Sequence, residues 1–360
     1  MKKLLQLIVL GFFSLSTFGQ DIHFSQYRET PLFINPANVG FFDGYQRAIL
    51  NYRSQWTSAG SPFKTMAASV DGELGLKRNK NTYIGLGGTF FQDVAGAANW
   101  KQFQGTLYSS AVVKVAKKAH LALGLGAGYS QNSADFSSLT FGNQYNGTEF
   151  STELPSFENF QFRKYGYLDL SSGMIFEFKN TTINFDRNDL FDVRVGVAAY
   201  HLNQPKLQFS SSSDQRLERR ISTFLEGRYD LKGTNISFLP SIIYMKQGEF
   251  SQVNTGLLAR FRFLNQTKIT GVRHESALLI GAYTRIGDAV IPQVMVEMFG
   301  FNVGISYDYN ISSYKTATRG SGGFEISLKW TNLRDGIFKQ GREFGRGKGA
   351  ASSPSATPAD

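Results

Sequence analysis

The sequence predicts an antiparallel, membrane-spanning β-barrel of about fourteen strands. From Gln46 onward, apolar and polar residues alternate with a period of two, which is the periodicity of a β-strand. The alternating segments are about ten to thirteen residues long, which suits a tilted crossing of a bilayer better than a soluble strand of ordinary length. Aromatic residues recur where these segments end, as in the girdles of membrane barrels.

Residues 1–20 have the layout of a secretory signal peptide. Two lysines precede an apolar run over residues 4–13, and small and polar residues continue to Gly19. The apolar run is too short to span a bilayer as a helix. Cleavage beside Gln20 would export the chain and leave Gln20 or Asp21 as its first residue.

Residues 21–45 precede the first strand, and we expect them to fold into the barrel lumen as a plug. They contain Asn35-Pro36-Ala37, a turn signal that stops a strand or starts a short helix. They also carry too much apolar surface to remain in water, and glycine-lined strand faces leave space for them. The residues expected to form the plug are Phe24, Tyr27, Asn35 and Pro36.

The barrel itself is expected over residues 46–332. The predicted strands are 46–56, 64–74, 82–92, 103–115, 119–131, 166–178, 192–202, 219–231, 235–246, 251–264, 275–286, 289–298, 300–310 and 322–332. Their apolar faces would contact outer-membrane lipid. An even number of strands returns the chain to its starting side, so the expected location is the cell outer membrane with both termini in the periplasm.

Charged residues on the polar strand faces have two interpretations. They are Arg194, Glu226, Arg228, Arg260, Arg262 and Glu325. They could define a pore or a substrate groove, or they could pair with one another and with residues 21–45 inside a plugged lumen. The second interpretation is favoured.

The connection at 132–165 is expected outside the cell and holds seven aromatic residues. Three of them, Phe150, Phe157 and Phe160, are candidates for binding a partner protein. An equally open alternative is that the loop folds over the barrel mouth as a lid.

Residues 333–360 are expected to form a basic, flexible periplasmic tail. Arg342, Arg346 and Lys348 lie among glycines, before an end rich in serine, proline and alanine that cannot build a core. The tail could contact an acidic protein or the cell wall, although a solvated extension without a partner is also consistent with its composition.

The composition excludes several classes of protein. No cysteine is present, so disulfide scaffolds and thiolate metal sites are excluded. The net charge of +10 is scattered along the chain rather than clustered, which argues against nucleic acid as a partner. The four histidines lack metal-ligand spacing, and no Ser/His/Asp set can be assembled. We therefore expect no enzymatic activity, no metal and no cofactor.

Several short motifs, the most specific of them near the amino terminus, resemble those of one protein family. They are Phe24-Ser25-Gln26-Tyr27, Pro31-Leu32-Phe33-Ile34-Asn35-Pro36-Ala37 and Asn51-Tyr52-Arg53-Ser54-Gln55-Trp56, and matches continue through His201-Leu202-Asn203-Gln204-Pro205 to Gly322-Gly323-Phe324-Glu325-Ile326-Ser327-Leu328. Together they resemble the PorP/SprF family, whose members are outer-membrane proteins of the type IX secretion and gliding-motility systems of Bacteroidetes.

The resemblance implies a barrel related to the fatty-acid transporters, with a role in exporting or surface-anchoring cargo proteins such as adhesins. It implies partners among the secreted cargo, the type IX machinery and peptidoglycan-associated proteins, and it supplies no catalytic residues. The rival hypothesis is a channel that moves small hydrophobic molecules through the barrel wall.

Overall fold

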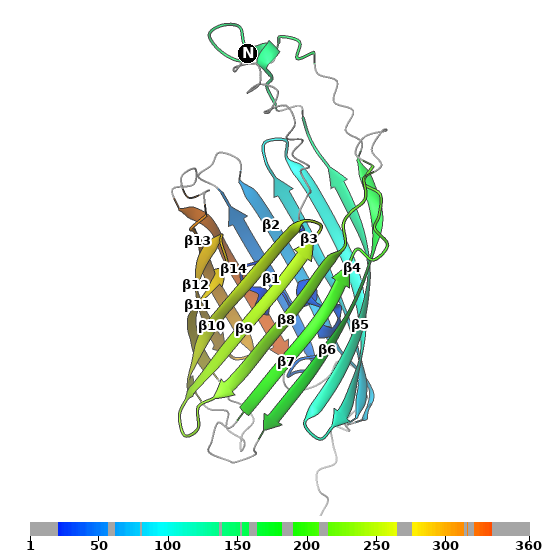
Figure 1. Cartoon of the computed structure of the whole chain (residues 1–360), viewed down its shortest axis with the longest axis vertical. Coiled ribbons are helices and arrows are strands. Elements are labelled where there is room, and N and C mark those ends of the chain that lie inside the picture. The colour runs from blue at the N-terminus through cyan, green and yellow to red at the C-terminus, as the bar shows by residue number, and fades with distance from the viewer. Residues whose placement is uncertain are drawn as a thin grey trace, which may run out of the picture.

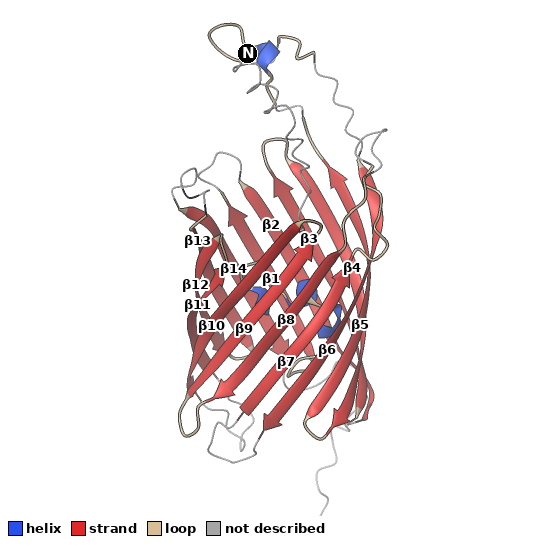
Figure 2. Ribbon diagram, viewed as in Figure 1, coloured by secondary structure: helices blue, strands red, loops and turns tan. Residues whose placement is uncertain are grey.

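The chain forms one closed antiparallel barrel (Figures 1 and 2). A computed structural model describes residues 21–56, 62–79, 81–136, 139–151, 153–157, 164–181, 190–208, 215–264, 276–312, 315 and 320–332. The strands within these ranges are β1 (Gln46–Gln55), β2 (Phe63–Asn79), β3 (Thr82–Ala95), β4 (Trp100–Ala116), β5 (Ala119–Ser133), β6 (Tyr165–Thr181), β7 (Leu190–Tyr200), β8 (Arg220–Asp230), β9 (Ile236–Gln247), β10 (Phe250–Leu264), β11 (Ser276–Arg285), β12 (Ala289–Met298), β13 (Phe301–Asn310) and β14 (Ser321–Asn332).

Every strand pairs with its neighbours in sequence, and β1 closes the barrel against β14. That closing ladder runs from Gln46 opposite Asn332 to Gln55 opposite Gly323. The predicted fourteen-strand antiparallel barrel is therefore confirmed. Several strands are longer than the alternating segments that predicted them. For example, β4 has 17 residues, whereas the predicted strand covered residues 103–115.

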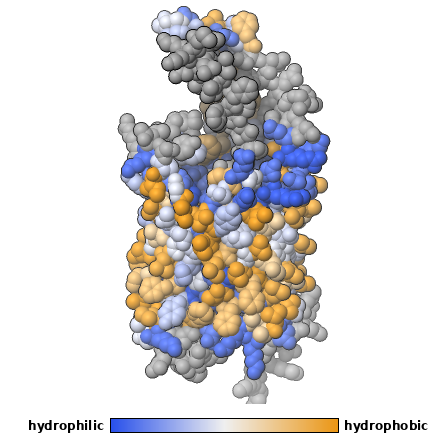
Figure 3. All heavy atoms as spheres, in the orientation of Figure 1, coloured by the Kyte–Doolittle hydropathy of each residue, from blue (hydrophilic) through white to orange (hydrophobic). Residues whose placement is uncertain are grey.

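The strands turn apolar side chains outward and polar side chains inward. In β13 the exposed residues are Phe301, Val303, Ile305, Tyr307 and Tyr309, and the buried ones between them include Asn302, Ser306 and Asp308. On the face of the barrel seen in Figure 3, the apolar side chains form a band, with hydrophilic side chains toward both ends. Such a band is far larger than the apolar patches that water-soluble monomers expose, and it suits a bilayer.

The two ends of the barrel differ in their connections. Residues 134–164 and 201–219 connect strands at one end, hereafter the long-loop end. The turns at 117–118 and 231–235 lie at the opposite, short-turn end. Within the described ranges, no helix has the length and hydropathy needed to cross a membrane.

Residues 21–45, hereafter the N-terminal segment, run through the interior of the barrel. Three short helices lie in this segment, namely η1 (Tyr27–Glu29), α2 (Pro31–Ile34) and η2 (Pro36–Asn38), seen in blue inside the barrel in Figure 2. Asp21 contacts His201 and Gln247 at the long-loop end, whereas the Tyr45 N–H donates to the Asn332 carbonyl at the short-turn end.

The described chain thus begins and ends at opposite ends of the barrel. Asp21 lies at the long-loop end and Asn332 at the short-turn end. The even number of strands returns the wall to its starting side, but the N-terminal segment adds one further crossing through the lumen. A chain that began at Asp21 would therefore have its two ends on opposite sides of the membrane, rather than both in the periplasm.

Glycines on the inner face let the N-terminal segment approach the wall. A Cβ added to Gly124 in β5 would collide with the backbone of Pro36 and Ala37, and one added to Gly173 in β6 would collide with Asn35. The turn at Asn35-Pro36-Ala37 therefore rests directly on the backbone of these two strands.

We expect Gly124→Val to destabilise the barrel by about 1–3 kcal/mol, because the new side chain overlaps the turn at residues 36–37. The band of the folded, heat-modifiable barrel on gel electrophoresis should then disappear after heating to a lower temperature than for the wild type. Ala127→Val, on the outward face of the same strand, is the control and should leave that temperature unchanged. Equal shifts for both variants would contradict the close packing.

Candidate functional site in the lumen and the loop hairpin

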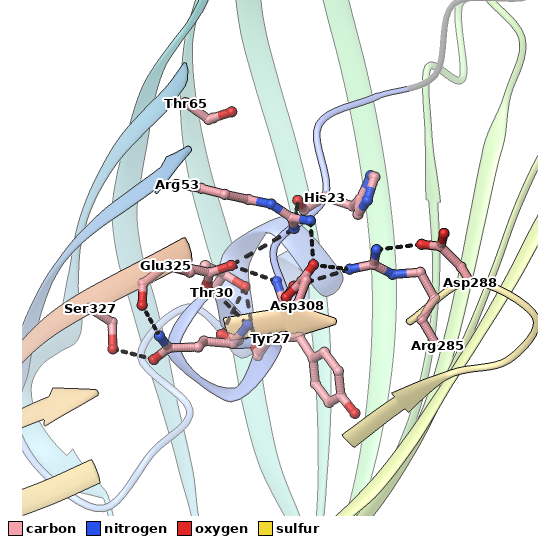
Figure 4. A network of polar contacts seen from close by, with 12 residues as sticks. His23, Tyr27, Thr30, Arg53, Thr65, Arg285, Asp288, Asp308, Glu325 and Ser327 are labelled. Atoms are coloured by element: carbon pink, nitrogen blue, oxygen red, sulfur yellow. Dashed lines mark hydrogen bonds and ion pairs between the residues drawn. The ribbon is translucent and has the colours of Figure 1, made fainter. Parts of the chain in front are cut away.

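A buried cluster of four charged side chains lies inside the barrel, toward the long-loop end (Figure 4). The Asp308 carboxylate of β13 accepts hydrogen bonds from the guanidinium groups of Arg53 of β1, at 2.9 Å, and Arg285 of β11, at 3.1 Å. Glu325 of β14 lies 3.8 Å from Arg53. Each of these residues exposes 5% or less of its surface, so each charge depends on its partners rather than on water.

The charge cluster holds the N-terminal segment. The Ser25 hydroxyl donates to Asp308 at 2.7 Å. The backbone N–H groups of Ser25 and Gln26 donate to the two carboxylate oxygens of Glu325, at 2.7 and 3.0 Å. The Arg53 guanidinium also donates to the His23 carbonyl. Strands from opposite ends of the sequence are therefore joined through the first residues of the segment.

The carboxyl half of the segment has its own anchors. The Arg47 guanidinium donates twice to Asp71, at 2.9 and 2.8 Å, and stacks over the Phe42 ring at 4.2 Å. Asp71 also accepts from the Gly40 N–H at 2.9 Å. The Asn35 amide donates to carbonyls of β6 and β7 at 3.1 and 3.0 Å.

The amino end of the segment is held by a histidine between two carboxylates. His201, just after β7, lies 2.6 Å from Asp21 and 2.9 Å from Asp169 of β6. Arg220 lies 3.2 Å from Asp21 and stacks over the Tyr200 ring at 4.2 Å. Burial alone would lower the pKa of His201, but the attraction of Asp21 and Asp169 outweighs it and raises that pKa to about 9. His201 is therefore a cation at neutral pH.

A cavity of about 260 Å³ lies between the N-terminal segment and the wall. Its lining combines charged side chains, several of which pair with one another, with apolar side chains such as Phe224, Leu239 and Leu258. Lys329 lies 2.8 Å from Glu29, and Arg194 lies 3.0 Å from Glu226. A hydrophobic guest in this cavity would meet charged groups as well as apolar side chains.

Most of the charged strand residues singled out from the sequence have partners inside the lumen. Arg194 also donates to the Asn38 side chain and the Phe41 carbonyl, at 2.8 and 3.2 Å. Arg260 pairs with Glu297 and Arg228 with Asp230, at 2.7 and 2.9 Å. These contacts agree with pairing inside an occupied lumen rather than with an open, charge-lined pore.

The four residues expected to form a plug are all buried within the barrel. Phe24 lies 5.6 Å from Phe33, and Tyr27 lies 4.8 Å from Tyr283 of β11, between ring centroids. Asn35 and Pro36 form the turn against β5 and β6. No group of three histidine or carboxylate side chains in the described part of the chain is placed to hold a metal ion.

Beyond the barrel, part of the long connection forms a small hairpin, hereafter the loop hairpin (residues 139–151 and 153–157). It contains η4 (Gly142–Gln144) and a β-bridge between Tyr145 and Phe150, and it stands clear of the wall in Figure 1. Phe150 and Phe157, two of the candidate partner-binding residues, are 55% and 82% exposed. The third, Phe160, and the tail residues Arg342, Arg346 and Lys348 lie outside the described residues.

Sequence reasoning missed the roles of Asp308, Arg285 and Asp21. Asp308 and Arg285 do lie on polar strand faces, which was the available signal. Alternation shows that such a residue points inward, but not which residue of a distant strand meets it.

Comparisons with known proteins identify one matching family and several solved structures of β-barrels with a similar fold. The family model described as type IX secretion system membrane protein PorP/SprF matches residues 16–330. No curated protein sequence matches the chain.

Among solved structures, similar chains include a deltaS2 mutant of the monoaromatic hydrocarbon channel TodX, with 8% identity, a TM-score of 0.47, and coverage of 85% of this chain and 94% of that one. A FadL homologue from Pseudomonas aeruginosa has 11% identity, a TM-score of 0.43, and coverage of 85% and 94%. BamA from Haemophilus ducreyi, lacking POTRA domains 1–3, has 10% identity, a TM-score of 0.40, and coverage of 80% and 70%.

We expect Asp308→Asn to lower the stability of the barrel by about 3–5 kcal/mol, because it leaves the buried Arg53 and Arg285 with only one buried carboxylate, Glu325. The temperature at which the heat-modifiable band disappears would report the loss. Asp288→Asn is the control, since Asp288 also pairs with Arg285 but its side chain is 41% exposed, where an ion pair contributes about 0–1 kcal/mol. Equal losses of stability in the two variants would contradict a stabilising role for the buried cluster.

We also expect a pH dependence that originates at His201. Because its pKa is raised, its contribution, on the order of 3 kcal/mol, is fully present below pH 6.5 and is lost as the pH rises through about 9. Thermal unfolding of the detergent-solubilised barrel between pH 6 and pH 10 would show a decline that His201→Gln reduces. His120→Gln, at the short-turn end, should retain the wild-type decline. An identical decline in all three proteins would contradict the assignment.

Proposed function

The chain belongs to the PorP/SprF family of type IX secretion system membrane proteins, and we propose that it serves this system as an accessory protein that binds partners rather than conducting them. It is an outer-membrane β-barrel. The observation that carries the proposal is the occupied lumen, in which the N-terminal segment is bonded to the wall through buried charges from β1, β11, β13 and β14.

Under this proposal the two ends of the barrel have different partners. The long-loop end faces the cell exterior, where the loop hairpin binds secreted cargo, such as an adhesin, and supports its export or anchoring. The short-turn end faces the periplasm. There the exposed Lys117, Lys118 and Lys232, together with the basic tail at 333–360, contact the secretion machinery or peptidoglycan-associated proteins.

A channel for small hydrophobic molecules remains the second candidate. A lateral passage beside the Asn35 turn would need an opening between β5 and β6 or between β6 and β7. Both pairs of strands are paired without interruption beside the turn, for example from Ser172 opposite Ala199 to Thr181 opposite Leu190. A hydrophobic guest in the cavity would also desolvate the charged side chains that form part of its lining.

Copurification after mild detergent extraction tests the proposal. The tagged full-length protein should retain secreted cargo or machinery components, and a strain lacking the protein should fail to display that cargo. Replacing residues 142–157 by a short Gly/Ser linker should abolish cargo retention without abolishing the heat-modifiable barrel. Normal cargo display in the deletion strain would overturn the accessory role.

We expect that deleting residues 22–40 opens the barrel, because this removes the material that fills the lumen. Ion conductance in planar bilayers should be detectable for the deletion and absent for the full chain. The double variant Ser25→Ala, Gln26→Ala keeps the segment but weakens its anchors, and intermittent conductance is expected from it. A closed barrel in both variants would show that something other than the N-terminal segment blocks the lumen.

We expect the tail to contribute salt-sensitive binding. A chain ending at Leu333 should still fold and insert, but it should lose copurification with periplasmic components. Replacing the five basic residues of 333–349 by glutamine should have the same effect, because at physiological salt such attraction reaches only about 8 Å. Unchanged copurification in both cases would place those contacts elsewhere.

A further inference from the structure

The loop hairpin is organised by its own hydrogen bonds. The Gln144 side chain is buried, accepts from the Phe141 N–H at 3.0 Å, and donates to the Leu154 carbonyl at 2.9 Å. Asn146 closes the turn by accepting from two backbone N–H groups, each at 2.9 Å. The hairpin therefore presents a preformed surface, which lowers the entropic cost of binding.

That surface is aromatic. Tyr145 and Phe150 are 50% and 55% exposed, and their ring centroids are 5.1 Å apart. Phe157 is 82% exposed. Aromatic side chains of this size are frequent at binding hot spots, where a partner covers them.

The same surface is acidic, in contrast to the rest of the chain. Residues 139–157 include Glu149 and Glu153 and no lysine or arginine, whereas the whole chain has a net charge of +10. Glu149 is exposed, as is Glu153. Neither carboxylate forms an ion pair with any residue that the structure describes.

Elsewhere in this protein, an aromatic face next to a carboxylate binds arginine. Arg47 stacks over Phe42 while it donates to Asp71, and Arg220 stacks over Tyr200 while it pairs with Asp21. In each case the guanidinium is flanked by a ring and a carboxylate. The loop hairpin displays the same two groups without an arginine.

We propose that the loop hairpin is a docking site for an arginine-bearing, partly apolar peptide segment of a secreted partner. Apolar side chains of that segment cover Phe150 and Phe157, while its guanidinium groups meet Glu149, Glu153 and the Tyr145 ring. This inference rests on the proposed function, and it adds the chemistry by which the partner is recognised.

The test uses the purified full-length barrel in detergent and fluorescently labelled peptides. The probe is the hexapeptide Arg-Leu-Arg-Leu-Arg-Leu, compared with peptides in which citrulline or glutamate replaces arginine, or serine replaces leucine. Citrulline keeps the shape of arginine but removes its charge. Fluorescence anisotropy should show the arginine-leucine peptide binding at least ten-fold more tightly than each of the others, with affinity falling as salt rises.

Variants of the hairpin separate charge from packing. Glu149→Gln with Glu153→Gln should weaken the arginine-leucine peptide at least ten-fold and abolish its preference over the citrulline peptide. Phe150→Ser with Phe157→Ser should weaken binding further while leaving barrel folding intact. Glu249→Gln is the control, because Glu249 is an exposed carboxylate in the β9–β10 turn at the same end of the barrel. This variant should bind the peptide as tightly as the wild type does.

Two outcomes would overturn the inference. The first is equal binding of the arginine and citrulline peptides. The second is displacement of the peptide by maltooligosaccharides, which would identify the surface as a glycan site. The proposed function is tested separately, because loss of cargo retention on replacing 142–157 would support it even where these peptides show no charge preference.

Discussion

The structure depends on one constraint, which is that charged groups facing a barrel lumen must be neutralised there. Asp308, Glu325, Arg53 and Arg285 come from four strands and are almost completely buried. Isolated charges in such a position would cost several kcal/mol each. The N-terminal segment supplies the remaining hydrogen bonds, so the wall and its contents stabilise each other.

The same cluster supports a weak stretch of wall. Beside Asp308, the ladder between β12 and β13 omits the pairs at Ile291 and Pro292, because proline has no N–H to donate. On the other side of Asp308, the register with β14 shifts between Asp308 and Tyr309. Side-chain ion pairs thus reinforce β13 where its backbone hydrogen bonds are incomplete.

The sequence was sufficient for the strand count, the closed antiparallel topology and the direction in which each side chain points. Those properties follow from local alternation, as in residues 300–310. The sequence was not sufficient for the pairing of Arg53 with Asp308, which joins strands 255 residues apart. The sequence also did not predict that Asp21 lies at the long-loop end, because no local pattern in residues 21–45 indicates that they cross the whole lumen.

The contacts at the barrel's closing seam have a consequence for the energetics of barrel closure. Arg53 of β1 and Glu325 of β14 are register partners across the seam, and both are bound to residues 23–26. The first and last strands of the barrel therefore meet over residues 23–26 of the N-terminal segment. Sealing an empty cylinder would trap both charges without these partners. Closing the seam and filling the lumen are therefore thermodynamically coupled, because each stabilises the other.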